Sequence, residues 1–192
     1  MKYEEFYKHS LKEREDIIQE INFSETRLVF SLLGSCQRLV KWLLDKEGIS
    51  KNLIGIYMPY SKEAINDFLG FNPCNYVNSE TTRKLADKNY VKFYKNKNLK
   101  NEMISIAVSS SLKTNRIKRS NDNGYITIYN GKKFSTYKIE FVPGKLSRVK
   151  QDFIISFYVL KIIYLYLFKN IDKLKTFDIA YLEIANVEEQ KC

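Results

Sequence analysis

Two short apolar runs, each followed by a turn and then by a segment with helical spacing, constrain the fold of this 192-residue chain most strongly. The runs are Arg27–Leu33 and Leu53–Tyr57. Nearly continuous apolar runs of this length are typical of strands buried on both faces, as in a parallel sheet. Gly34 and Ser35 follow the first run and turn the chain into a predicted helix over residues 36–44. This pattern predicts an α/β fold.

The rest of the chain continues the alternation of helices and strands. Asn130 and Gly131 separate two strand-like runs, which predicts a hairpin. Residues 177–184 fit either an edge strand or part of a helix. The remaining predicted elements are a helix around 11–21, a helix capped by Ser61, a helix over 78–94, strands over 103–108, 124–129 and 134–142, and a helix over 146–168. Helices alternating with buried strands predict a three-layer α/β/α sandwich.

Length and composition predict one globular domain. Hydrophobic residues make up 44% of the chain and charged residues 28%, which argues against disorder. We find no internal repeat and no linker-like segment. We therefore expect a single domain over residues 1–192, with a core of about 16–168 and a C-terminal extension over 169–192.

The most apolar segment, residues 153–168, raises the question of a membrane span. A span needs about 20 apolar residues. This segment is shorter and carries Lys161 near its middle, so we predict a buried or interface helix and no membrane partner. The first five residues include two acids and no apolar stretch, which argues against a secretory signal. We expect a cytoplasmic protein.

The cysteine and histidine content argues against a metal centre. Cys36, Cys74 and Cys192 form no CxxC pair, and the chain holds a single histidine. Three cysteines without a disulfide framework fit a reducing compartment. We expect no metal site and no cofactor.

Three segments resemble one known family when they are taken together. Residues 60–70 read YSKEAINDFLG, residues 77–81 read VNSET, and residues 106–108 read IAV. They are similar, in the same order and at similar spacing, to the Y-S-N-E-A-K-x-x-L-L-G, A-V-S-x-E-T and I-A-V-T-G-I-A-G-P segments of the CinA C-terminal family, the nicotinamide-nucleotide amidases. The resemblance covers about residues 16–168. It implies an α/β/α domain, a homodimer and a small nucleotide-like ligand.

The resemblance also implies roles for individual residues, and one of them is changed. The family's E-S-C-T-G-G turn matches residues 34–39, which places Ser35 at the nucleophile and Cys36 beside it as a substrate-binding residue. The family's catalytic Lys falls on Ile65, which has no group that can act as a base. Arg38 and Leu39 replace the two glycines of the turn.

Other site residues follow from the remaining matches. Tyr60 matches a family tyrosine associated with the site, and Lys62 lies three residues before Ile65, so it is a candidate replacement base. Ser109 matches the family's Thr. Further candidate substrate-binding residues are Lys113 and Arg116, in the loop expected to face Ser35, and Arg148, a phosphate anchor.

Several functions remain open on the sequence. The first is a catalytically impaired CinA-like protein with a ligand-binding or interaction role, and the second is an active amidohydrolase that uses Ser35 with a new base. The third is a nucleic-acid-binding protein, because residues 83–119 hold eleven Lys and Arg against two acids, with aromatic residues between them. Structural interpretations also stand: Ser35 as a helix N-cap and Cys36 as a small buried residue.

Overall fold

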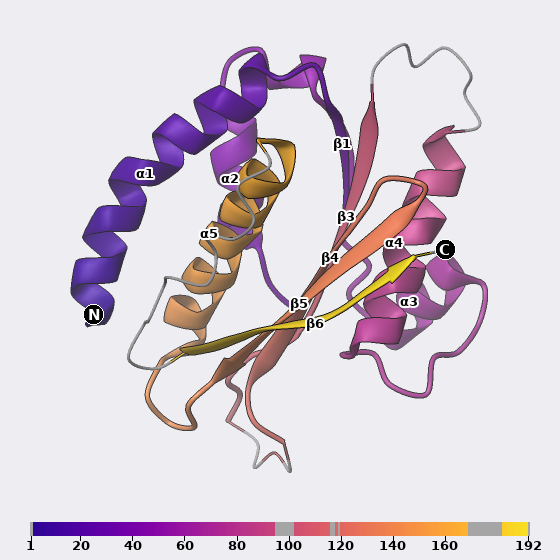
Figure 1. Cartoon of the computed structure of the whole chain (residues 1–192). Helices are drawn as coiled ribbons and strands as arrows, with labels where there is room; N and C mark the ends of the chain where they lie inside the picture. The colour runs from indigo at the N-terminus through magenta and orange to yellow at the C-terminus, as the bar shows by residue number, and fades with distance from the viewer. Residues whose placement is uncertain (1, 95–101, 116–117, 119, 169–181, 192) are drawn as a thin grey trace.

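A computed structural model describes residues 2–94, 102–115, 118, 120–168 and 182–191 of the chain (Figure 1). The elements are, in order, α1 (Tyr3–Phe23), β1 (Arg27–Leu33), α2 (Gln37–Leu44), the 3₁₀ turn η1 (Ile49–Lys51), β2 (Leu53–Tyr57), α3 (Lys62–Leu69), α4 (Ser79–Tyr94), β3 (Met103–Ser111), β4 (Asn123–Tyr129), β5 (Lys133–Phe141), α5 (Arg148–Leu167) and β6 (Leu182–Lys191). The predicted alternation of helices and strands is therefore confirmed.

The strands form one mixed six-stranded sheet in the order β2-β1-β3-β4-β5-β6. β1 pairs in parallel with both β2 and β3, and the pairs from β3 to β6 are antiparallel. The segment that the sequence left open at 177–184 contributes its end to the edge strand β6, while residues 177–181 lie outside the described residues. β3 continues three residues beyond the predicted end at Val108, because Ser109–Ser111 pair with Tyr125–Asn123 of β4.

Helices cover both faces of the sheet, which confirms the three-layer α/β/α architecture. α1, α2 and α5 lie on one face, and α3 and α4 lie on the other (Figure 1). α5 contacts both α1 and α2, and α4 crosses strands β1, β3, β4 and β5. The sheet thus holds the carboxyl ends of β1, β2 and β3 at one edge, where open α/β sheets place their ligands.

The apolar sequence of α5 is explained by its position inside a single chain. The helix packs between the sheet and the outer helices, and every residue from Gln151 to Ile163 is buried. Its Ser147 side chain caps the first turn by accepting a hydrogen bond from Lys150 N at 3.4 Å. Among the described residues, no helix is long and apolar enough to cross a membrane. The homodimer stays a prediction, since burial within the chain already accounts for the apolar helix.

Candidate functional site

The site begins at the turn between β1 and α2, which packs tightly against β3. Gly34 has a φ of +80°, and a Cβ at this position would come within 2.3 Å of the Ser110 carbonyl oxygen. Only glycine therefore fits without backbone movement, because it lacks a Cβ and adopts positive φ freely. Ser35 directly follows Gly34, so it lies close to the carboxyl end of β3.

Ser35 is buried, and among the described residues its hydroxyl has one hydrogen-bond partner, the neighbouring Cys36 thiol. The side chain of Ser35 lies 3.6 Å from Cys36 Sγ, with either atom as the donor. Among the described residues, no histidine, lysine or carboxylate forms a hydrogen bond with this hydroxyl. The interpretation of Ser35 as an N-cap is wrong, since the cap position of α2 is Cys36 and no side chain of the turn itself caps the helix.

The amides at the start of α2 are bound by a carboxylate from α5. Asp152 Oδ1 accepts hydrogen bonds from Cys36 N at 2.7 Å and from Gln37 N at 3.3 Å. Its Oδ2 accepts a bond from Arg38 Nη1 at 3.0 Å. Sequence reasoning missed Asp152, although an acid directly before the apolar run of α5 is a detectable signal, because buried carboxylates need partners.

Cys36 is a structural residue rather than a nucleophile. Its side chain is fully buried. Burial, assisted by the nearby Asp152 carboxylate, raises the pKa of the Cys36 thiol to about 12. The thiol is therefore protonated at neutral pH, whereas nucleophilic attack requires a thiolate. The structure thus agrees with the interpretation of Cys36 as a small buried residue.

Ile65 lies in the wall of a cavity of about 320 Å³ at the carboxyl ends of β1 and β3. Its side chain is buried and packs with Leu33 and Leu69. The cavity is lined by Leu33, Gly34, Pro59, Tyr60, Lys62, Ile65, Tyr76, Val77 and Ser110. Apolar and aromatic side chains thus dominate the wall, with one cation, as is common for small-molecule sites.

The structure brings Tyr60 and Lys62 to this cavity but does not join them to Ser35. Tyr60 is 78% exposed and stands at the rim. Lys62 Nζ lies 5.7 Å from the centroid of the Tyr76 ring, in cation–π geometry. Ser35 is absent from the cavity lining, so the predicted nucleophile and the predicted replacement base do not form a pair here.

Ser109 is held by packing between the sheet and α4. Its hydroxyl lies 2.6 Å from Thr82 Oγ1, in a fully buried pair. The next residue, Ser110, donates a hydrogen bond to the Leu33 carbonyl at 3.2 Å. The serine run thus cross-links β1, β3 and α4, and Ser110 rather than Ser109 lines the cavity.

Lys113 and Arg148 meet on the other side of the turn. Arg148 donates from Nη2 to the Gly34 carbonyl at 3.1 Å and from Nη1 to the Lys113 carbonyl at 3.5 Å. Arg148 therefore ties two loops together, and the Lys113 side chain is exposed. Arg116 lies outside the described residues.

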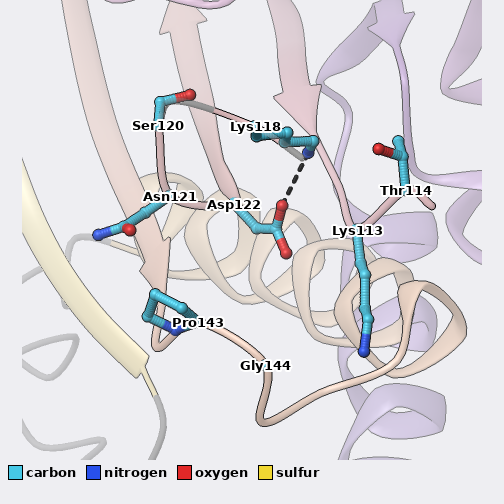
Figure 2. Close-up of a pocket in the computed structure, with 8 residues that line it drawn as sticks. All are labelled: Lys113, Thr114, Lys118, Ser120, Asn121, Asp122, Pro143 and Gly144. Carbon is cyan, nitrogen blue, oxygen red and sulfur yellow. Dashed lines mark hydrogen bonds and ion pairs between the residues drawn. The ribbon is translucent and has the colours of Figure 1, made fainter. Parts of the chain in front are cut away.

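A second, polar hollow of about 230 Å³ adjoins Lys113 (Figure 2). Lys118 forms an ion pair with Asp122 at 2.7 Å, and Gln151 Nε2 donates to the other oxygen of Asp122 at 2.9 Å. Gln151 also accepts a bond from Lys113 N at 2.7 Å. No sequence pattern predicted this network, which joins the end of β3, the start of β4 and α5.

The basic region at 83–119 is only partly described, and its aromatic residues pack on one another and on rings of the sheet. Tyr90 stacks on Tyr94 at 5.0 Å and meets Tyr129 edge-on at 5.0 Å. Tyr94 is 61% exposed. One exposed ring is a limited stacking surface, because single-strand binding uses successive aromatic platforms.

We compared the chain with family models, with curated proteins and with solved structures. The chain matches no family model and no curated protein. Among solved structures it is similar to a competence or damage-inducible protein from Enterobacter asburiae, with 15% identity over 82% of this chain and 96% of that chain and a TM-score of 0.64. A CinA superfamily protein from Klebsiella pneumoniae 700603 gives 10% identity, coverage of 81% and 95%, and a TM-score of 0.65.

The chain has the fold of the CinA superfamily. A further CinA superfamily structure, from Enterobacter cloacae, matches over 80% of this chain and 89% of its own, with 15% identity and a TM-score of 0.64. The fold implied by the sequence resemblance is thus confirmed. Identities this low establish the fold alone, so the activity has to be argued from the residues of the site.

Proposed function

We propose that this chain is a CinA-like protein that has lost amidase chemistry and binds a small ligand in the cavity beside Ile65. The observation that carries the proposal is the position of Ile65, whose apolar side chain forms part of the cavity wall. The sequence resemblance assigns the catalytic Lys to this position. An isoleucine there leaves no group that accepts a proton.

The surroundings of Ser35 support the same conclusion. A serine hydroxyl is a weak nucleophile unless a neighbouring base takes its proton. Among the described residues, the Ser35 hydroxyl forms a hydrogen bond with the Cys36 thiol alone, and Lys62 Nζ lies over the Tyr76 ring. Loss of general-base assistance alone typically lowers a rate by about 10²–10⁴-fold.

The cavity that remains suits a small ligand with a flat apolar part. Tyr60 and Tyr76 supply aromatic faces, and Ile65 and Val77 supply aliphatic contacts. Lys62 supplies the one positive charge of the lining, which favours an anionic substituent on the ligand. A nucleotide-like compound meets these requirements.

Ammonia release from nicotinamide mononucleotide tests the loss of activity. We expect no release by the purified chain, no difference for Ser35→Ala, and release by an active CinA-family amidase assayed beside it. Release by the wild-type chain that disappears in Ser35→Ala would overturn the proposal. In that case Lys62→Ala and Lys113→Ala would identify the replacement base.

Ligand binding is tested separately from catalysis. Nicotinamide mononucleotide is titrated into the labelled protein, and we expect amide chemical shifts to change at Tyr60, Ile65 and Val77. Ile65→Trp fills the cavity and should abolish these shifts. Val91→Trp places the same side chain at an exposed position on α4, away from the cavity lining, and should leave them intact. Equal loss in both variants would contradict binding in the cavity.

A further inference from the structure

The β1–α2 turn has the shape of an anion cradle. Cys36 adopts the left-handed conformation, with φ +74° and ψ +24°, directly before the right-handed residues of α2. It is the one non-glycine residue with positive φ in the part of the chain that the structure describes. Such a change of hand makes successive backbone N–H groups converge, and the positive end of the helix dipole adds to their attraction for negative charge.

The anion bound in this cradle is a side chain of the protein, the Asp152 carboxylate. Asp152 reaches it from α5, an element far away in the sequence. One carboxylate oxygen accepts from the N–H groups of Cys36 and Gln37, and the other accepts from the Arg38 guanidinium. The Asp152 side chain is 4% exposed, whereas Arg38 is 35% exposed. A bound carboxylate or phosphate group would make the same set of contacts.

The first two turns of α5 hold the β1–α2 turn from two directions. Arg148 donates to the Gly34 carbonyl, while Asp152, four residues later, accepts from the amides of Cys36 and Gln37. The Arg148 guanidinium therefore binds a carbonyl of the turn, and the Asp152 carboxylate binds N–H groups of the turn. Because Asp152 is almost completely buried, an external anion can reach these N–H groups only by displacing its carboxylate.

We propose that Asp152 is a built-in occupant of the cradle, which closes the turn beside Ser35 to external oxyanions. The inference rests on the proposed function, since it adds a second physical reason, independent of Ile65, for the loss of amidase chemistry. Acyl transfer needs N–H donors that are free to stabilise the developing oxyanion. A ligand in the Ile65 cavity consequently gains no charge stabilisation from the amides of Cys36 and Gln37.

Chemical rescue with formate tests this role. Asp152→Ala removes the carboxylate, and formate has the same carboxylate geometry. We would measure the midpoint of thermal unfolding in sodium formate and in sodium chloride at equal ionic strength. For Asp152→Ala we expect a higher unfolding midpoint in formate than in chloride, and the difference should saturate as formate rises. When the formate concentration equals its Kd, the folding equilibrium constant should have increased twofold. The wild-type chain should show no such difference.

Asp45→Ala is the matched control. Asp45 also carries a carboxylate near α2, but it lies at the C-terminal end, is exposed and pairs with Lys41. Its loss should give no formate-specific effect. Equal responses to formate and chloride in Asp152→Ala, or an equal formate response in Asp45→Ala, would overturn the inference.

Two further measurements keep the test decisive if Asp152→Ala does not fold. Asp152→Asn keeps the shape of the side chain and removes its charge, and it should bind formate weakly or not at all. In the wild-type protein the amide resonances of Cys36 and Gln37 should not move during a formate titration, and movement there would contradict an occupied cradle. The ammonia assay is independent: turnover by the wild-type chain would refute the loss of activity, whereas absent formate rescue would refute only the role of Asp152.

Discussion

Gly34→Ala is the substitution whose cost follows most directly from the geometry of the site. The residue has a φ of +80°, and a Cβ would lie 2.3 Å from the Ser110 carbonyl oxygen and 3.1 Å from Ser110 Oγ. An alanine with left-handed dihedrals costs about 1–2 kcal/mol. Relieving the overlap requires the turn or β3 to move, which costs about 1–3 kcal/mol for a crowded interior. We expect a total loss of about 2–5 kcal/mol in the free energy of unfolding.

Gly144→Ala separates these two contributions. Gly144 has a similar φ of +73°, but a Cβ there would meet no atom within 4 Å. It therefore measures the conformational cost alone, about 1–2 kcal/mol. Urea unfolding of both variants beside the wild type gives the two losses, provided that the slopes with denaturant agree.

The difference between the two variants is the informative quantity. A loss at Gly34 that exceeds the loss at Gly144 by about 1–3 kcal/mol supports a close contact between the turn and β3. Equal losses would refute the reasoning, since they would mean that the β1–α2 turn is not pressed against Ser110. That result would also weaken the placement of Ser35 beside the carboxyl end of β3.

Three other substitutions test separate parts of the argument. The unfolded Cys36 thiol loses its proton near pH 8.5, whereas burial keeps the folded thiol protonated to about pH 12. Stability should therefore fall as pH rises above about 8.5, by about 2 kcal/mol at pH 10, and this loss should be absent in Cys36→Ala. Glu13→Gln removes the charge that pairs with the largely buried Lys161. We therefore expect the free energy of unfolding, measured in urea, to fall by about 1–3 kcal/mol. Replacing both residues by Met should recover much of this loss. Ile65→Lys supplies an amine without freeing the cradle from Asp152, and we expect no ammonia release above that of Ile65→Met.

The fold was predictable because its strongest signals are local. β1 and β2 are continuous apolar runs with clear ends, and both were predicted with the observed bounds. Ser61 caps α3 by accepting a hydrogen bond from Ala64 N at 3.2 Å. Asn130 closes the hairpin by accepting from the amides of Lys132 and Lys133. In each case the decisive contacts join residues a few positions apart, which sequence patterns record.

The site was less predictable because its contacts join distant parts of the chain. Asp152 binds amides more than one hundred positions earlier, and no local pattern specifies such a pairing. Sequence similarity placed Ser35, Tyr60 and Lys62 in one neighbourhood, but it did not show that Ser35 lies outside the cavity lining. The left-handed backbone conformation of Cys36 was also not predictable, because positive φ at a residue other than glycine depends on tertiary contacts.

Packing and one ion pair hold the β1–α2 turn in its observed shape. The sequence resemblance assigns glycines to positions 38 and 39, where this chain has Arg38 and Leu39. Leu39 is fully buried in the core, and Arg38 pairs with Asp152. The replacements therefore contribute to the same turn that Gly34 and Cys36 shape. A left-handed Cys36 costs about 1–3 kcal/mol and persists only where neighbouring contacts hold it, and Asp152 supplies the hydrogen bonds that do so here.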